Sequence, residues 1–450
     1  MATSAATAGL RPRIRQVAAA SVGNAVEWYD WLAYSYLAVY FADQIFPRGE
    51  GQLTPLLGAY AVFAAGFVMR PVGGLLLGAY ADRQGRRAAL MLTIALMGVG
   101  QLVMVFMPTY NQVGLLAPLL LTVARLVQGM SVGGEFAISA VFLVESAPSH
   151  RRGLFSSFSY VSSNLGQFLA AGTTMLLTAV LTNATVHAWA WRIPFAIGAV
   201  ACMVAFWVRH STAETYPLAS RIRGGQATPP RLLEFAVHYP RQTLLVVGMT
   251  LAATVVFYTW TSFLPTYAQI TVGFDPGSAA AIGTIALALF TVLQPFAGML
   301  SDRVGRKPLL VVFGAGFTLL TVPMLKLLNN SFWSLLLTMC FGMVLLSCYT
   351  ANAAVIMVEL FPARVRTVGV GLPYSSTVAL FGGTAPYLAT LLIEHGRASW
   401  FGWYVTVLAL VSTVIYIAMR ETRGKSLDSP SFETAAEIPG YSAAHPVRAN

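Results

Sequence analysis

Six ionisable side chains lie inside long apolar stretches of the first half of the chain. They are Glu27, Asp30, Arg70, Arg125, Glu135 and Arg192. Burying a charge in an apolar environment is costly, so residues of this kind mark ion pathways, proton relays and substrate contacts. The apolar stretches of the second half carry no charge near their middle and offer polar groups instead, namely Tyr258, Gln294, Tyr349, Asn352, Tyr374 and Tyr387. We therefore expect the charged chemistry in the first half.

Arg125 and Asp30 lie near the middle of their stretches and suit complementary tasks. A guanidinium can hold a carboxylate through two parallel hydrogen bonds, so Arg125 is a candidate to bind an anionic substrate or to reset a carboxylate. Asp30, or Glu27 about one helical turn before it, is a candidate to carry a proton. A buried ion pair that only fixes helix packing would explain the same two residues, so both interpretations stay open.

The other charges also have two interpretations each. Glu135 ends the glycine-rich segment 129–135 and either takes part in proton coupling or ties its helix to a gate. Arg70 precedes Pro71 and either lines a cavity or braces a helix kink. Arg192 follows Trp191, a residue type common at membrane interfaces, and is a further candidate for substrate contact.

Aromatic residues offer an alternative binding chemistry, because aromatic faces attract a cation. The candidates for such a box are Trp28, Trp31, Tyr34, Tyr258 and Trp260. Aromatic residues in apolar stretches also pack or face lipid, so this interpretation competes with a structural one. Tyr34 and Tyr258 are included among the candidate substrate contacts.

Other chemistry is not expected. Residues 129–133 spell Gly-x-Ser-x-Gly, but a nucleophile elbow follows a strand and this segment lies in an apolar helical stretch. The six histidines make no pair with metal-ligand spacing, and the three cysteines have neither metal nor disulfide spacing. We predict that the chain is no enzyme and has no cofactor and no metal site.

The composition is typical of a helical membrane protein. Hydrophobic residues make up 56% of the 450 residues and charged residues only 10%, with a mean hydropathy of +0.66. The net charge of +11 does not indicate nucleic-acid binding, because the bases lie in short segments between apolar stretches and without stacking aromatics. The first apolar stretch contains Glu27 and Asp30 and lacks a cleavage site, so we expect no cleavable signal peptide.

Twelve stretches are long enough to span a bilayer, which takes about 20 apolar residues. They lie at 17–41, 55–81, 88–107, 113–144, 152–182, 189–209, 243–270, 277–300, 308–328, 332–359, 366–393 and 399–420. The longest internal polar segment, 210–242, divides them into two sets of six, 17–209 and 243–420. Residues 1–16 and 421–450 are predicted tails. The fold class is an all-α polytopic membrane protein with two six-helix bundles.

The loop charges predict the orientation. With the N-terminus in the cytoplasm, 22 of the 28 Lys and Arg residues fall in the tails and the cytoplasmic loops. Arg48, Lys326 and Arg397 alone fall on the outer side. Because basic residues concentrate on the cytoplasmic side, we expect both termini and the loop 210–242 to be cytoplasmic.

A loop motif occurs twice, in register with the two sets of spans. Gly78-x-x-x-Asp82-Arg83-x-Gly85-Arg86-Arg87 recurs as Gly298-x-x-x-Asp302-Arg303-x-Gly305-Arg306-Lys307. Glu145-x-x-Pro148-x-x-x-Arg152 recurs as Glu359-x-x-Pro362-x-x-x-Arg366, and Glu214-Thr215 recurs as Glu421-Thr422. The repeats keep one orientation six spans apart, which predicts two halves related by an axis along the membrane normal, with a cavity between them.

These motifs resemble those of the major facilitator superfamily. Gly23-Asn24-x-x-Glu27-Trp28-Tyr29-Asp30, Arg70-Pro71-x-Gly73-Gly74, Arg125-x-x-Gln128-Gly129-x-Ser131-x-Gly133-Gly134-Glu135 and Trp191-Arg192-Ile193-Pro194-Phe195 resemble its metabolite:proton symporter branch. The segments 257–261 and 368–372 resemble the α-ketoglutarate (2-oxoglutarate) permeases, with Met357 standing where those permeases are expected to have a lysine.

The resemblance implies a secondary active transporter whose two bundles rock around a central site. It implies proton-coupled symport of a small organic anion, a dicarboxylate or a keto acid such as α-ketoglutarate. The gating residues implied are Gly78, Asp82, Arg83, Gly85, Arg86, Arg87, Asp302, Arg303 and Arg306, which would hold an outward-open state. The expected location is the inner (plasma) membrane, as a multi-pass monomer in the lipid bilayer.

Two alternatives remain. A symporter of the same fold for proline or betaine would use the aromatic box in place of Arg125. A sensor that no longer transports would signal through its cytoplasmic segments, but the sequence contains no soluble signalling domain.

Overall fold

The computed structural model describes residues 2–47, 54–211, 214, 233–424 and 427. The described residues form helices joined by short connections, without a strand among them. Twelve long rods can be followed along the described chain, six before and six after the central segment. The predicted fold class is confirmed.

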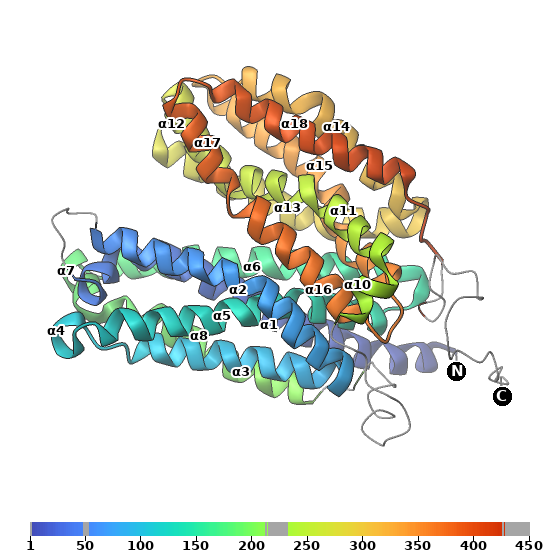
Figure 1. The fold of residues 1–450 in the computed structure, drawn as a ribbon, viewed down its shortest axis with the longest axis horizontal. Coiled ribbons are helices and arrows are strands. Elements are labelled where there is room, and N and C mark those ends of the chain that lie inside the picture. Colours follow the sequence, from blue (N-terminus) through green and yellow to red (C-terminus); the bar gives the residue numbers. More distant parts are fainter. Residues whose placement is uncertain (1, 48–53, 212–213, 215–232, 425–426, 428–450) are drawn as a thin grey trace.

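The first bundle contains six long helices that run side by side (Figure 1). They are α1 (Ala2–Ile45), α2 (Thr54–Gln84), α3 (Arg86–Val105), α5 (Leu116–Ser146), α6 (Arg152–Val180) and α8 (Arg192–His210). The short elements α4 (Tyr110–Val113), α7 (Asn183–Thr185) and η2 (Val186–Ala190) lie between them at one end, and η1 (Ser149–Arg151) lies at the other. Helix α1 begins at Ala2, so the helical conformation extends through the segment that the sequence predicts as a tail.

The second bundle repeats this plan. Its rods are α11 (Pro240–Tyr258) with α12 (Leu264–Val272), α13 (Pro276–Val304), α14 (Arg306–Lys326), α15 (Phe332–Leu360), α16 (Arg366–Thr377) with α17 (Ala385–Glu394), and α18 (Ala398–Ala418). Two rods contain a π-helical turn, η3 (Thr259–Phe263) and η4 (Val378–Gly382), which the sequence did not predict. The predicted central loop holds a short helix, α10 (Glu234–His238), in its described part.

Within the residues that the structure describes, ten rods are long and apolar enough to cross a membrane by themselves. The two that fall short are α1 and α6, and their composition explains why. Helix α1 carries Glu27 and Asp30, and α6 is rich in serine and threonine. Both rods pack against apolar neighbours within the bundle, so polar residues in them are compatible with a spanning position.

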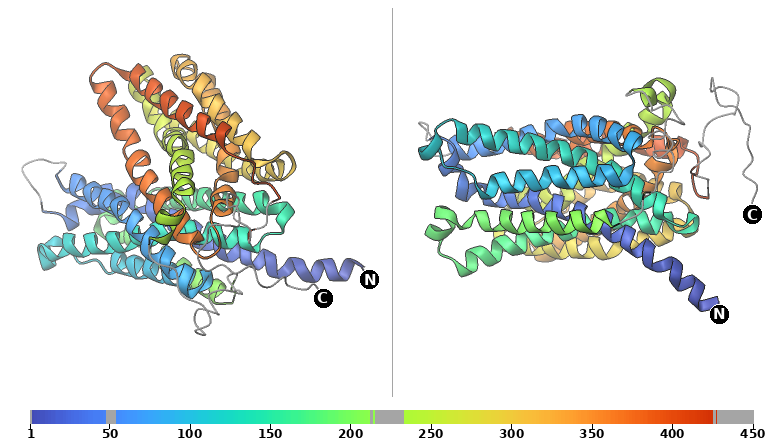
Figure 2. Two further views of the ribbon diagram at one scale, coloured as in Figure 1. Left: turned by 45° about the vertical axis from the view of Figure 1, so that its right-hand side comes forward. Right: turned by 90° about the horizontal axis from the view of Figure 1, so that it is seen from below.

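The two repeat loops, 82–87 and 302–307, lie at the same end of the molecule, here called the repeat-loop face. Gly85 and Gly305 have φ angles of +106° and +105°, a region that L side chains rarely adopt, and they allow the sharp reversal between consecutive helices. The bundles meet near this face and diverge toward the opposite face, which carries α7 and α12 (Figures 1 and 2).

Small residues allow the bundles to touch. Gly74 of α2 faces Gly371 of α16, and a Cβ added at Gly74 would lie 2.6 Å from the carbonyl oxygen of Gly371. Gly153 of α6 faces Gly298 of α13 in the same way, at 2.6 Å. Side chains larger than hydrogen would therefore hold the bundles apart at these two points.

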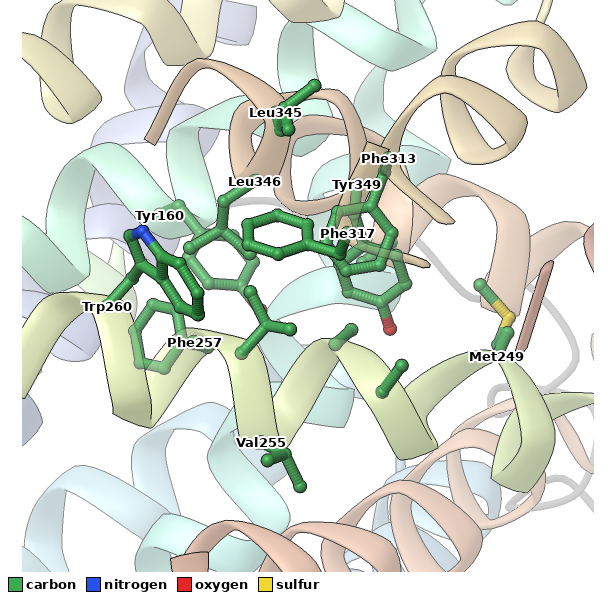
Figure 3. Packing of buried hydrophobic residues seen from close by; sticks show 14 of the residues in the cluster. Tyr160, Met249, Val255, Phe257, Trp260, Phe313, Phe317, Leu345, Leu346 and Tyr349 are labelled. Carbon is green, nitrogen blue, oxygen red and sulfur yellow. The ribbon is translucent and has the colours of Figure 1, made fainter. Parts of the chain in front are cut away.

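The interior of the second bundle is apolar and aromatic (Figure 3). Trp260 packs edge-on against Phe317 with ring centroids 4.8 Å apart, and Phe313 packs against Tyr349 at 5.2 Å. This packing fixes the positions of the side chains that α11 and α15 present to the first bundle.

Candidate functional site

A small cavity lies between the two bundles. It is lined by residues of α1, α2 and α6 on one side and of α11, α15, α16 and η4 on the other. Its polar lining includes Arg70 and the hydroxyl groups of Tyr160, Thr250, Tyr258, Tyr349 and Tyr374. The cavity measures about 30 Å³, so it has room for about two water molecules.

Arg70 brings a positive charge to this cavity. Its side chain is only 6% exposed, and Nη1 donates a hydrogen bond to the Tyr258 hydroxyl at 3.3 Å. The guanidinium lies over the rings of Phe67 and Trp31, 4.2 and 4.7 Å from their centroids. In the described part of the chain it forms no ion pair, and its Nε has no hydrogen-bond partner. A desolvated guanidinium of this kind is suited to receive an anion.

The backbone around Arg70 fixes its position. Gly133 of α5 packs directly against it, because a Cβ there would lie 1.9 Å from the Arg70 carbonyl oxygen. Pro71 follows inside the helix and supplies no backbone N–H. Of the two interpretations of Arg70, the cavity-lining one matches its location.

Arg125 and Asp30 form an ion pair in the interior of the first bundle. Nη1 and Nη2 of Arg125 lie 2.9 and 3.2 Å from the two carboxylate oxygens of Asp30. Gln101 donates to the same carboxylate at 2.7 Å, and the guanidinium lies 4.1 Å from the centre of the Tyr34 ring. Arg125, Asp30 and Tyr34 are all fully buried, and none of them lines the cavity.

Glu27 and Glu135 lie nearer to the repeat-loop face. Glu135 pairs with Arg209 and also accepts a hydrogen bond from Thr93. Arg209 in turn donates to the carbonyl oxygens of Ala19 and Leu90, so this cluster ties together α1, α3, α5 and α8. Glu27 is 5% exposed, and its Oε2 has no hydrogen-bond partner among the described residues.

Arg209 was missed by the sequence analysis. It lies at the end of a span, where it counts as one of the basic residues that set orientation. Only the structure places it inside the bundle, fully buried and in contact with Glu135. The sequence does not show whether an arginine side chain at the end of a span points out of the membrane or back into the helix bundle.

Arg192 lies away from the cavity. It is at the start of α8, near the opposite face, where Nη2 donates to the Met107 carbonyl oxygen at 2.8 Å. Its guanidinium lies 4.1 Å from the centre of the Trp191 ring. These contacts fix a helix end.

The five aromatic residues do not form one box. Trp28 and Tyr258 line the cavity, and Trp31 lies behind Arg70. Tyr34 is buried against Arg125, and Trp260 is buried in the second bundle, where its indole N–H donates to the Thr338 carbonyl oxygen. The helices turn these residues toward different interiors, so the structure places Trp28 and Tyr258 alone of the five candidates at the cavity.

The repeat loops join the two bundles through matched contacts. Asp82 pairs with Arg86 at 2.7 Å and accepts hydrogen bonds from the backbone N–H groups of Thr367 and Val368 at 3.1 and 3.0 Å. Asp302 pairs with Arg306 at 3.0 Å and accepts from the N–H groups of Gly153 and Leu154 at 2.8 and 2.9 Å. Each aspartate thus binds the first turn of a helix in the other bundle.

The second repeated motif also crosses between bundles. Glu145 of the first bundle pairs with Arg366 of the second at 2.8 Å and lies 3.5 Å from Arg86. Glu359 of the second pairs with Arg152 of the first at 3.5 Å. The glutamate of each copy therefore meets the arginine of the other copy, which the repeats alone did not predict.

The third repeated motif places a carboxylate at a helix start. Glu214 accepts hydrogen bonds from the backbone N–H groups of Arg86 and Arg87 at the start of α3. Glu421 accepts from those of Arg306 and Lys307 at the start of α14, at 3.0 and 2.9 Å. Arg87 also donates to the His210 carbonyl oxygen, and the Arg303 carbonyl oxygen accepts from Arg423. Thr215 lies outside the described residues.

Known proteins are similar to this chain in sequence and in fold. The family model described as Major Facilitator Superfamily matches residues 24–372 and 249–447. The alpha-ketoglutarate permease of Escherichia coli K12 is 39% identical over 93% of this chain and 96% of its own. The citrate-proton symporter of Klebsiella pneumoniae is 33% identical over 90% and 91%.

A further relative and a solved structure are also similar to this chain. The glycine betaine/proline/ectoine/pipecolic acid transporter OusA of Dickeya dadantii is 30% identical over 92% of this chain and 85% of its own. A solved structure of the proton:xylose symporter XylE superimposes with a TM-score of 0.77, covering 93% of this chain and 98% of that one at 17% identity. At that identity the likeness concerns the fold alone.

Proposed function

The chain belongs to the major facilitator superfamily, and from this membership we propose that it is a proton-coupled symporter of a small organic anion. Its relatives are transporters and not enzymes. We propose a dicarboxylate or keto acid such as α-ketoglutarate as the substrate, in keeping with the names of two relatives.

The observation that carries this proposal is the position of Arg70 in the cavity. It is a buried guanidinium that lines the cavity between the bundles and forms no ion pair in the described chain. A buried guanidinium outside an ion pair is unfavourable, and a substrate carboxylate would complete such a pair. Arg125 is neutralised by Asp30, so Arg70 takes over the first substrate contact that the sequence suggested for Arg125.

Asp30 supplies the coupling to protons in this proposal. While Asp30 is ionised it holds Arg125 in a buried pair. Protonation of Asp30 weakens that pair, and Arg125, which lies in the first bundle like Arg70 but outside the cavity, then adds its attraction for the same substrate carboxylate that Arg70 binds. Two more carboxyl groups lie between Asp30 and the repeat-loop face. They are Glu27, which is one helical turn from Asp30 and forms no ion pair among the described residues, and Glu135.

Alternating access supplies the transport step. The cavity has a volume of about 30 Å³, which is too small for a dicarboxylate, so loading requires the bundles to separate. We propose that the repeat-loop face is cytoplasmic, in line with the positive charges of its loops. The contacts of Asp82 and Asp302 would then hold the cytoplasmic side closed while the other side loads. The chain acts as a monomer in the inner membrane in this proposal.

Uptake into proteoliposomes tests the role of Arg70. With an inward proton gradient, the wild type is expected to accumulate labelled α-ketoglutarate, and Arg70→Ala to raise the apparent KM by about 10- to 100-fold. Arg70→Lys keeps the charge but loses the planar fork, so an intermediate KM is expected. Arg397→Ala, at an exposed position outside the cavity, is the control. Wild-type affinity in Arg70→Ala would contradict the assignment of the substrate site.

A second candidate substrate is a zwitterion such as betaine or proline. Trp28, Phe257 and Tyr258 give the cavity aromatic faces that suit an ammonium group, and one relative is named for such substrates. Competition of labelled α-ketoglutarate uptake with betaine and proline distinguishes the two. Strong competition that Trp28→Ala abolishes would favour the zwitterion.

A further inference from the structure

The wall that the second bundle contributes to the cavity is uncharged. Its described lining contains aromatic, apolar and hydroxyl-bearing side chains but no ionisable acid or base apart from tyrosine. Arg70 stands on the opposite wall, from the first bundle. A substrate in this cavity therefore meets one positive charge at one end and neutral groups at the other.

Two neighbouring hydroxyl groups in the uncharged wall are buried. Thr250 of α11 is 1% exposed and Tyr349 of α15 is 2% exposed. Among the described residues, neither hydroxyl makes a hydrogen bond of standard geometry to a group outside this pair. They lie close to each other, and the Tyr349 hydroxyl points toward α11 (Figure 3). The two hydroxyl groups carry two donor hydrogens and a bond between them uses only one, so the pair can still donate to a further oxygen.

A third hydroxyl group of this wall is already engaged. Tyr258 accepts the hydrogen bond from Arg70. The ring of Tyr349 is held against Phe313, so its hydroxyl cannot turn away into the bundle. Thr250 and Tyr349 thus form a fixed pair of buried hydroxyl groups in this wall that can donate to a ligand oxygen.

We propose that Thr250 and Tyr349 form a second half-site, which binds an uncharged oxygen at the end of the substrate remote from Arg70. This inference rests on the proposed function and names the form of the substrate. Arg70 balances one carboxylate, whereas a second ionised carboxylate against the uncharged wall would stay unbalanced. The transported species is therefore a monoanion whose far end is a hydroxyl, a keto group or a protonated carboxyl group.

Three four-carbon acids test the far end of the site. Butyrate has no oxygen there, 4-hydroxybutyrate has a hydroxyl, and succinate has a carboxyl group. Each is used to inhibit uptake of labelled α-ketoglutarate by the full chain in proteoliposomes. We expect 4-hydroxybutyrate to inhibit the wild type about tenfold better than butyrate. Succinate should inhibit through its monoanion. Above the pKa of its second carboxyl group, the fraction of this monoanion rises about tenfold for each unit by which the pH falls. The inhibition by succinate, measured relative to that by 4-hydroxybutyrate, is expected to rise by the same factor.

Two variants and a control assign the effect to the hydroxyl pair. Tyr349→Phe is expected to remove the preference for 4-hydroxybutyrate while leaving inhibition by butyrate unchanged, and Thr250→Val to reduce it. Tyr416→Phe is the matched control, because that buried hydroxyl donates to the Met249 carbonyl oxygen outside the cavity. It is expected to keep the wild-type preference.

The outcomes separate this inference from the proposed function. If wild-type liposomes take up no labelled α-ketoglutarate and no inhibitor of this class acts, the proposed function fails. If uptake occurs but Tyr349→Phe and Thr250→Val keep the preference for 4-hydroxybutyrate, or if succinate inhibits independently of pH, the hydroxyl half-site is wrong and the anion symporter stands.

Discussion

A proton and a guanidinium compete for the same carboxylate in the first bundle. Asp30 accepts from Arg125 and Gln101, and all three side chains are fully buried. A neutral amide at position 30 would imitate the protonated acid, because it lacks the negative charge that holds Arg125. The ion pair is therefore expected to affect proton-driven accumulation of the substrate more than the affinity of the protein for the substrate.

Asp30→Asn should separate exchange from accumulation. We expect the variant to exchange labelled for unlabelled substrate near the wild-type rate, while its proton-driven accumulation falls about 10- to 100-fold. Counterflow and gradient-driven uptake in the same liposomes measure the two properties. Gln101→Leu serves as the comparison, because it removes a neutral hydrogen bond to Asp30 but keeps the ionisable group. Full proton-driven accumulation in Asp30→Asn would exclude Asp30 as the coupling residue.

At the scale of residues, the sequence predicts which side chains matter better than where they point. Asp30, Arg70 and Arg125 stand out because a charge in an apolar stretch is visible in the sequence. Which arginine faces the cavity depends on the rotation of α2 and α5 about their axes, and that rotation is set by close contacts such as Gly133 against Arg70. Thr250 carries no sequence signal, because threonine is an ordinary residue in an apolar helix.

At the scale of elements, each repeat loop is a helix start held by a distant carboxylate. Burial raises the pKa of Glu421, but the backbone N–H groups of Arg306, Lys307, Arg423 and Thr422 lower it more, so the pKa is below its usual value. The folded protein therefore prefers the ionised carboxylate. The stabilisation is present above the pKa of the unfolded chain and is lost as the pH falls through the lower folded-state pKa.

Glu421→Gln should destabilise the protein in a pH-dependent way. At pH 7 we expect a loss of about 0.5–1 kcal/mol, in the range for a partly exposed carboxylate at a helix N-terminus. The difference from the wild type is expected to begin to shrink near the usual pKa of glutamate, about 4.3, and to disappear only below the lower folded-state pKa. Thermal unfolding in detergent between pH 7 and pH 4 measures it, with the exposed Asp43→Asn as control. An equal loss at both pH values would assign the effect to packing.

The elements themselves are largely predictable from the sequence. Long apolar stretches mark the twelve rods, because each rod must bury its backbone hydrogen bonds inside a membrane. The π-helical turns η3 and η4 escape prediction, since they depend on local packing around residues such as Gly382, where a Cβ would lie 2.6 Å from the Tyr258 ring. Helix α10 escapes because five residues are too short for a periodic signal.

At the scale of the whole molecule, two of the repeated motifs make reciprocal contacts across the boundary between the bundles. The sequence predicts two equivalent halves, but the structure shows that Glu145 meets Arg366 and that Glu359 meets Arg152, each across the boundary between bundles. Asp82 and Asp302 likewise bind helix starts in the opposite bundle. One face of the molecule is therefore closed by two nearly equivalent sets of contacts, and weakening one set should bias the position of the bundles.

Asp82→Asn tests that bias. The asparagine keeps one oxygen for the N–H groups of Thr367 and Val368 but loses the charge that pairs with Arg86. We expect the closed repeat-loop face to lose about 1–3 kcal/mol relative to its open form, and uptake to fall while the protein stays folded. Spin labels at Gln84 and Val304, exposed positions on the two loops, should report a longer distance between the bundles in the variant.

Asp302→Asn is the matched variant, because Asp302 makes the equivalent contacts with Gly153 and Leu154. If the two sets of contacts share the closure, each single variant should open the face in part and the double variant should open it further. Asp43→Asn, at an exposed position away from both loops, should leave the distance and the uptake unchanged. Unchanged distances and uptake in both Asp82→Asn and Asp302→Asn would mean that the glycine contacts between the bundles, and not the charged loops, determine which face is closed.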